Sequence, residues 1–213
     1  MLPPTIPLFP LPNAVLFPNV FLPLHIFEPR YREMVADALE GDRIIGMTLL
    51  RPGWERDYEG RPAIYPIGCA GLITFVERHK DGRYNIVLRG LEKFRVIEED
   101  ATTARPYRIA RVDSIVESVE SMSDDERSAM RTARRRLESL LVPQPEGRGA
   151  EPKVPPSMPD EDLVNALAQY LELEPVEKQA LLERETLLAR CRSLIELLEM
   201  KVMVAQHKWT GQH

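Results

Sequence analysis

Histidine, cysteine and serine often carry out chemistry in proteins, and this sequence places none of them in a recognised catalytic or metal-binding spacing. The histidines share no ligand spacing and occupy positions 25, 79, 207 and 213. The sequence also has no G-x-x-x-x-G-K-[ST] phosphate loop, no G-x-S-x-G elbow, no H-E-x-x-H helix and no G-x-G-x-x-G turn. We therefore expect a protein that is not an enzyme and that needs neither a metal nor a cofactor.

Cys69 and His25 are the residues around which an unrecognised catalytic site could still lie, whereas Cys191 favours a core role. Cys69 lies in a predicted strand, Cys191 occupies an apolar position of a predicted helix, and His25 lies in an apolar stretch. These surroundings favour packing or hydrogen-bonding roles, so an enzyme built on Cys69 or His25 is a minor alternative. Two cysteines this far apart do not favour a disulfide, and we expect free thiols in a cytoplasmic protein.

Aromatic residues are the candidates for binding a partner. The charged loop from Arg51 to Pro62 carries Trp54 and Tyr58, which form either a lid over the core or a contact surface. Truncation of Trp54 distinguishes the two, because a buried tryptophan costs far more stability than an exposed one. The N-terminal aromatic residues are Phe9, Phe17, Phe21 and Phe27, and we expect them to pack inside the fold. Phe17 and Phe21 are also candidates for binding a partner.

One basic cluster could contact nucleic acid. It contains five arginines within ten residues, at positions 127, 131, 134, 135 and 136. Acidic residues surround it, no aromatic residue interleaves with it, and the whole chain has a net charge of -5. We expect a solvated helix face here, and RNA binding is the alternative function.

The elements that must position these residues change character along the chain. Short runs rich in branched and aromatic residues predict an antiparallel barrel with strands at 44–50, 64–75, 84–88, 94–97 and 107–116. One helix begins near Pro29 and ends before Gly41, and Asp81-Gly82 predicts a type I′ hairpin turn. Pro66, Gly68 and Gly71 predict a bulged strand.

The second half of the sequence has the period of helices. Ser123 and Glu126 form a capping box, and a proline-rich stretch over 143–159 predicts an exposed, protease-sensitive linker. We expect two subdomains, a barrel over 1–120 and a helical bundle over 121–213. The first 27 residues lack charges, but prolines interrupt them and no basic region precedes the apolar residues, so we expect neither a membrane helix nor a signal peptide.

Three segments resemble the amino-terminal domain of Lon proteases. The first is IPLFPLPNAVLFPNVFLPLHIFEPRYREMVADAL from Ile6 to Leu39, with its paired proline-rich strands and its F-E-P-R-Y helix start. The second is DGRYNIVLRGLEKFRVIEE from Asp81 to Glu99, and the third is EKQALLERETLLARCRSLIELL from Glu177 to Leu198. Together they extend over nearly the whole chain in the family's order.

The resemblance implies an α+β fold, a PUA-like β-barrel followed by helices, and a role in holding protein substrates rather than cutting them. Lon proteases continue into ATPase and Ser-Lys peptidase modules, so the chain ending at His213 resembles the free-standing, single-domain members. The expected partners are unfolded or extended polypeptides, or a protease, in protein quality control. An exposed strand edge or an apolar groove between barrel and bundle would hold an extended segment.

Overall fold

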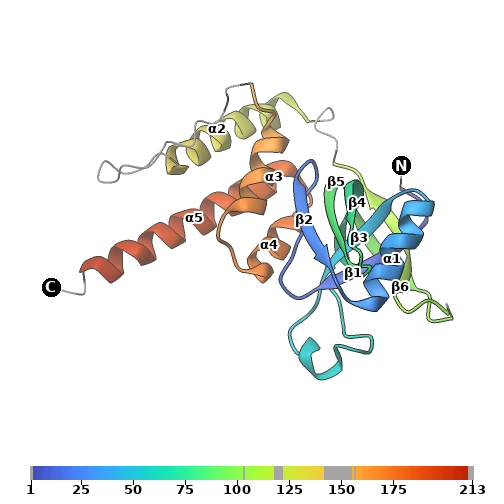
Figure 1. Ribbon diagram of the computed structural model, residues 1–213. Coiled ribbons are helices and arrows are strands. Elements are labelled where there is room, and N and C mark those ends of the chain that lie inside the picture. The colour runs from blue at the N-terminus through green and yellow to red at the C-terminus, as the bar shows by residue number, and fades with distance from the viewer. Residues whose placement is uncertain (1, 103, 118–121, 142–154, 156, 211–213) are drawn as a thin grey trace. The chain divides into compact units, whose positions relative to one another are not determined.

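The computed structural model describes residues 2–102, 104–117, 122–141, 155 and 157–210, with the backbone alone for 205–210. The chain forms two compact units (Figure 1). The first contains Met1–Val116 and Gln169–Glu183, and the second contains Glu117–Ala168 and Arg184–His213. The helices within the described ranges all lack the combination of length and apolar composition needed to cross a bilayer.

A mixed six-stranded sheet forms the centre of the first unit. Its strands are β1 (Thr5–Leu11), β2 (Phe21–Ile26), β3 (Ile44–Leu49), β4 (Ile67–Arg78), β5 (Tyr84–Glu99) and β6 (Arg108–Ile115). The strand order is β2-β5-β4-β3-β1-β6, and a further pairing of β5 with β6 closes the last five strands into a barrel. The expected barrel is therefore present, but it is not wholly antiparallel, because β1 pairs with β3 in parallel.

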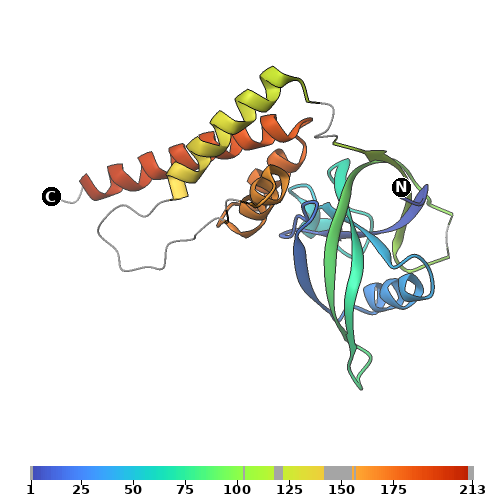
Figure 2. The same ribbon diagram turned by 90° about the horizontal axis from the view of Figure 1, so that it is seen from above.

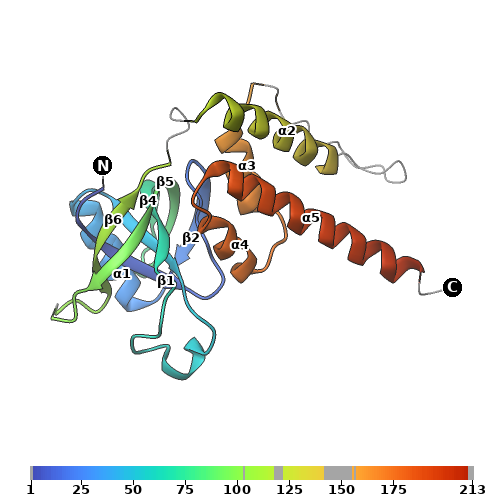
Figure 3. The ribbon, with the colours of Figure 1, turned by 180° about the vertical axis from the view of Figure 1, so that it is seen from behind.

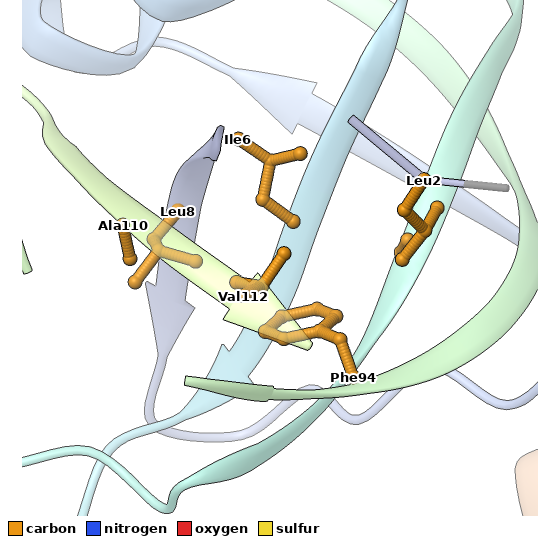
Figure 4. Close-up of a cluster of buried hydrophobic side chains, with 7 residues drawn as sticks. Leu2, Ile6, Leu8, Phe94, Ala110 and Val112 are labelled. Atoms are coloured by element: carbon orange, nitrogen blue, oxygen red, sulfur yellow. The ribbon is translucent and has the colours of Figure 1, made fainter. Parts of the chain in front are cut away.

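The barrel interior is filled by branched and aromatic side chains. Six of the seven residues of one buried cluster point toward one another in Figure 4: Leu2, Ile6, Leu8, Phe94, Ala110 and Val112. They come from β1, β5, β6 and the residues before β1. The cluster explains the branched and aromatic bias of the strands, because burying this apolar surface favours the folded chain by roughly 25 cal/mol per Å².

A long hairpin of β4 and β5 extends from the barrel (Figure 2). Gly82 has a φ of 82°, as expected for its turn. Asp81 does not have a positive φ, and the amide of Gly82 donates to the carbonyl of His79, so the loop is a three-residue turn rather than type I′. The predicted bulge is present, as a register shift between Cys69 and Gly71. A second shift lies between Ile73 and Phe75.

Helix α1 (Pro29–Glu40) connects β2 to β3 and begins at a proline, as predicted. Its buried face consists of Tyr31, Met34, Val35 and Ala38. The ring of Tyr31 lies 4.4 Å from that of Phe9 on β1, centroid to centroid. This buried face therefore packs α1 against the barrel.

Two glutamines join residues 169–183 to the barrel. The Gln169 side chain accepts from the amide of Phe17 at 3.2 Å and donates to the carbonyl of Val15 at 3.0 Å. Gln179 of helix α4 (Pro175–Leu182) donates to the carbonyl of Ile67 at 2.9 Å. These bonds satisfy buried backbone groups, and they explain why residues 169–183 belong to the first unit, whereas a boundary at 120 assigns them to the helices.

The second unit is helical, with α2 (Asp124–Leu141) and α5 (Leu187–Thr210) side by side (Figure 3). The capping box is present, since Ser123 Oγ accepts from the amide of Glu126 at 3.2 Å and the Glu126 carboxylate accepts from the amide of Ser123 at 2.8 Å. The predicted linker over 143–159 falls largely outside the described residues. Helix α3 (Asp160–Tyr170) links the two units along the chain.

Polar residues on α3 and α5 correct the predicted helix faces. The sequence pattern places Tyr170 on the apolar face of α3, yet its side chain is exposed and Asn165 is buried. The fully buried Arg190 on α5 donates to Asn165 at 3.0 Å and to Glu117 at 2.5 Å. A charge-compensated polar group thus occupies a core position that hydrophobic periodicity cannot reveal.

Candidate functional site

The loop that carries Trp54 and Tyr58 is held in place by the start of α1. Trp54 begins a short 3-10 helix, η1 (Trp54–Asp57), and its ring meets that of Tyr58 edge to face at 5.3 Å. The Tyr58 hydroxyl donates to Glu28 at 2.5 Å. Burial, followed by this hydrogen bond, raises the pKa of Tyr58. Tyr58 is therefore a structural anchor of the loop, with both its ring and its hydroxyl in use.

Arg30 completes this anchor. Its guanidinium lies over the rings of Tyr31 at 4.6 Å and Tyr58 at 4.8 Å, and it donates to Glu28 at 3.0 Å and to the Tyr58 carbonyl at 3.2 Å. Cation–π contacts combined with charged hydrogen bonds fix a loop firmly. Glu28, Arg30 and Tyr31 of the F-E-P-R-Y segment therefore act together to hold the loop. The sequence pattern did not predict this role.

A cavity of about 250 Å³ beside this anchor is lined by four arginines: Arg30, Arg61, Arg105 and Arg108. Three of them already form ion pairs: Arg30 with Glu28, Arg105 with Asp37, and Arg108 with Glu99. Arg61 donates to the carbonyl of Asp100. We assign no anionic ligand to the cavity, because nearby carboxylates compensate most of its positive charge.

Phe17 and Phe21 occupy opposite environments. Phe17 has no exposed surface, and so we remove it from the candidate contact residues. Phe21 is 49% exposed, contrary to the expectation that the N-terminal aromatics pack inside, and Phe27 is exposed as well. Phe9 and Phe17 alone of these four follow that expectation.

Phe21 belongs to an apolar outer face on strands β2, β5 and β4. We define the outer face as Phe21, Pro23, Phe75 and Val87. Pro23 pairs with Val87, and Val87 pairs with Phe75, so these three residues form a row across the strands. Phe21 lies two residues before Pro23 and therefore shares its face. Phe75 is 54% exposed.

The free edge beside this face is poorly suited to adding another strand. Within the described sheet, β2 is the strand with a single neighbour. Pro23 has no backbone N–H to donate, and the Phe21 carbonyl already accepts from the Tyr170 hydroxyl at 3.0 Å. The side chains of the outer face are consequently better candidates for contact than the strand edge.

The arginine cluster of α2 is largely engaged within its own unit. Arg134 donates to Glu138 at 2.8 Å and to Asp160 at 2.7 Å, and Arg136 donates to Glu199 at 2.8 Å. These pairs support the prediction of a solvated, ion-paired helix face and reduce the charge available to a phosphate backbone. RNA binding stays an untested alternative.

The two cysteines are buried, whereas His25 is exposed. Cys69 and Cys191 are free thiols without exposed surface, as predicted. Burial raises the pKa of Cys191 to about 11, which opposes the thiolate form that a nucleophile requires. His25 is exposed and bonds Asn85 at 2.7 Å. No group of three metal-ligating side chains occurs among the residues with described positions.

The sequence matches the model of a known protein family. Residues 5–200 match the model of the ATP-dependent protease La (LON) substrate-binding domain. The chain belongs to this family.

Curated relatives have similar sequences. The chain is 28% identical to Lon protease 2 of Myxococcus xanthus and 28% identical to the Lon protease of Anaeromyxobacter dehalogenans; each alignment covers 94% of this chain and 24% of the relative. The chain thus spans about a quarter of the length of these relatives.

Two solved structures share the fold. One is a Lon N-terminal domain protein from Xanthomonas campestris, with a TM-score of 0.61 and 22% identity over 90% of this chain and 97% of that one. The other is the N-terminal domain of a Mycobacterium avium complex Lon protease, with a TM-score of 0.66 and 17% identity over 92% and 98%.

Proposed function

We propose that this protein is a non-catalytic module that binds apolar, extended segments of unfolded polypeptides and serves as an adaptor or regulator in protein quality control. Membership of the substrate-binding family supports recognition of polypeptides. The observation that carries the proposal is the outer face, where two half-exposed phenylalanines, Phe21 and Phe75, flank Pro23 and Val87.

The outer face suits an unfolded client for physical reasons. Apolar area removed from water favours binding by roughly 25 cal/mol per Å², and aromatic rings supply that area with few rotatable bonds. The exposed Arg89 pairs with Phe21 across the strands. A cation at the rim of an apolar patch favours segments that carry acidic residues beside their apolar ones.

Binding through apolar side chains places few requirements on the sequence of the bound polypeptide. Strand addition would use a ladder of backbone hydrogen bonds, but Pro23 and the Tyr170 hydroxyl interrupt that ladder on β2. Contacts between apolar side chains have no directional requirement, so many different apolar segments fit. This breadth is what a quality-control module needs.

The test measures binding of a fluorescently labelled, reduced and carboxymethylated polypeptide by anisotropy. Phe21→Ser and Phe75→Ser should each weaken the affinity about tenfold, or ~1.4 kcal/mol. Ile97→Ser is the matched control, because Ile97 is a 39% exposed apolar residue of β5 outside the outer face. Melting curves of all variants establish that they fold.

Two results would contradict the proposal. One is equal affinity of the wild type for the folded and the unfolded form of the probe. The other is unchanged affinity in the Phe21→Ser/Phe75→Ser double variant. The adaptor role has its own measurement, the rate at which a Lon-type protease degrades the probe with and without this chain. An unchanged rate would contradict the adaptor role while leaving client binding intact.

A further inference from the structure

An open groove of about 520 Å³ runs along α2 and α5 in the second unit. Its floor contains Ala129, Ala133 and Ile195, and its rim carries charged side chains from both helices. The two small hydroxyl residues of α2 that line it are Ser128 and Thr132. The Thr132 hydroxyl donates to the Ser128 carbonyl at 3.1 Å, so its polar hydrogen is satisfied within the helix. Such a surface permits close approach of another helix.

The residues of α2 in this groove are arranged symmetrically about the midpoint between positions 130 and 131. Asp125 and Arg136 lie at the two ends, with Ser128, Ala129, Thr132 and Ala133 between them. When an identical helix is placed antiparallel about that midpoint, position 125 faces 136, 128 faces 133, and 129 faces 132. The small residues therefore meet at the centre, and each end brings an acid to a base.

Helix α5 repeats this complementarity with the charges in the opposite order. Arg192 lines the groove, and Glu199 lies seven residues later on the same face of the helix. In the same antiparallel arrangement, Arg192 of one copy faces Glu199 of the other. Two helices thus present reciprocal charge pairs under a single two-fold axis, which is the property of an isologous interface.

We propose that this groove binds a second copy of the chain, as an antiparallel two-fold dimer of the α2–α5 pair. Asp125 of one protomer meets Arg136 of its partner, and Arg192 meets Glu199. Arg136 and Glu199 already contact each other within one chain at 2.8 Å. Both side chains are partly exposed, so this pair stays intact in the dimer. At each end, Asp125 and Arg192 of one protomer then lie beside Arg136 and Glu199 of its partner. The proposal is independent of client binding, because every residue lies outside the outer face.

Sedimentation equilibrium at low salt tests the dimer, with an expected mass of twice 24.4 kDa that falls to the monomer value on dilution. Asp125→Lys and Arg136→Glu each bring like charges together at both ends, and each should weaken self-association at least about tenfold. An equimolar mixture of the two variants should regain the wild-type affinity, because each reversed charge then meets an opposite one. A merely structural defect would not be rescued by mixing.

Asp124→Lys and Arg135→Glu are the matched controls, since they make the same charge changes at neighbouring exposed positions of α2 outside the groove. They should leave self-association unchanged. A wild-type chain that stays monomeric at the highest soluble concentration overturns the proposal. Equal effects of the control and groove variants, or a mixture that fails to associate, overturn it as well.

Discussion

Tyr58 donates a hydrogen bond of 2.5 Å to Glu28, and this single contact ties the loop from Arg51 to Pro62 to the residue that precedes α1. The loop was expected to be either a lid on the barrel core or a free contact surface. Polar and aromatic contacts from the start of α1 hold the loop at its side.

Tyr58→Phe should release this anchor while keeping the ring. We expect a loss of about 1 kcal/mol in unfolding free energy, typical of one hydrogen bond, and faster tryptic cleavage after Arg56. Urea denaturation and timed proteolysis measure the two effects. Tyr65→Phe is the control; equal cleavage rates in the two variants would mean that the Glu28 contact does not hold the loop.

Trp54→Ala tests how much of the loop's stability comes from its aromatic pair. Trp54 is half-buried and contacts Tyr58, so we expect a loss of about 1 to 2 kcal/mol, more than for an ordinary surface change and less than for a buried tryptophan. Thermal unfolding gives the value. A loss above about 3 kcal/mol would indicate a lid over the core, and one below about 0.5 kcal/mol a free side chain.

Gly90→Ala should be strongly destabilising. The amide of Gly90 donates to Val20 at 2.8 Å, its carbonyl accepts from Asn19 at 3.0 Å, and an added Cβ would collide with the Phe17 carbonyl. We expect a loss of about 2 to 3 kcal/mol in urea unfolding. Gly41→Ala is the control and should cost at most about 1 kcal/mol, because its Cβ would have its closest neighbour at 3.8 Å. Similar losses in both would refute the crowding argument.

Cys191 should resist alkylation while the chain is folded. Burial raises its pKa from 9.0 to about 11, so in a Cys69→Ala background the labelling rate at pH 8 should be about 100-fold below that of an unfolded thiol. The raised pKa stabilises the fold below pH 9, and this contribution is lost as the pH rises toward 11. Urea midpoints at pH 8 and 10.5, compared with Cys191→Ala, check the sign; a midpoint difference independent of pH would contradict it.

Local sequence patterns predicted most elements correctly. The start of α1 at Pro29, the capping box of α2 and the positive φ of Gly82 all follow from one or two residues with strong backbone preferences. Strand continuity was harder to predict. The sequence pattern predicts separate strands at 84–88 and 94–97, yet β5 runs unbroken from Tyr84 to Glu99. Gly90 lies between the two predicted runs, where the Phe17 backbone approaches closely.

The outer face shows why the candidate site could be found only in part. Ile73 and Phe75 would share a face in a regular strand, but the register shift between them leaves Ile73 buried and Phe75 exposed. Alternation of apolar residues cannot reveal such a shift. The parallel pairing of β1 with β3 was missed for a similar reason, since strand direction depends on connections and not on composition.

Gln169 gives the first unit an unusual order of assembly. Its bonds to Phe17 and Val15 span 152 and 154 residues of sequence. During synthesis the barrel strands therefore emerge from the ribosome long before Gln169. Until Gln169 is made, the Phe17 amide and the Val15 carbonyl can form hydrogen bonds only with water. A fragment that ends at Val116 would lack Gln169, and these two backbone groups would stay without their protein partner.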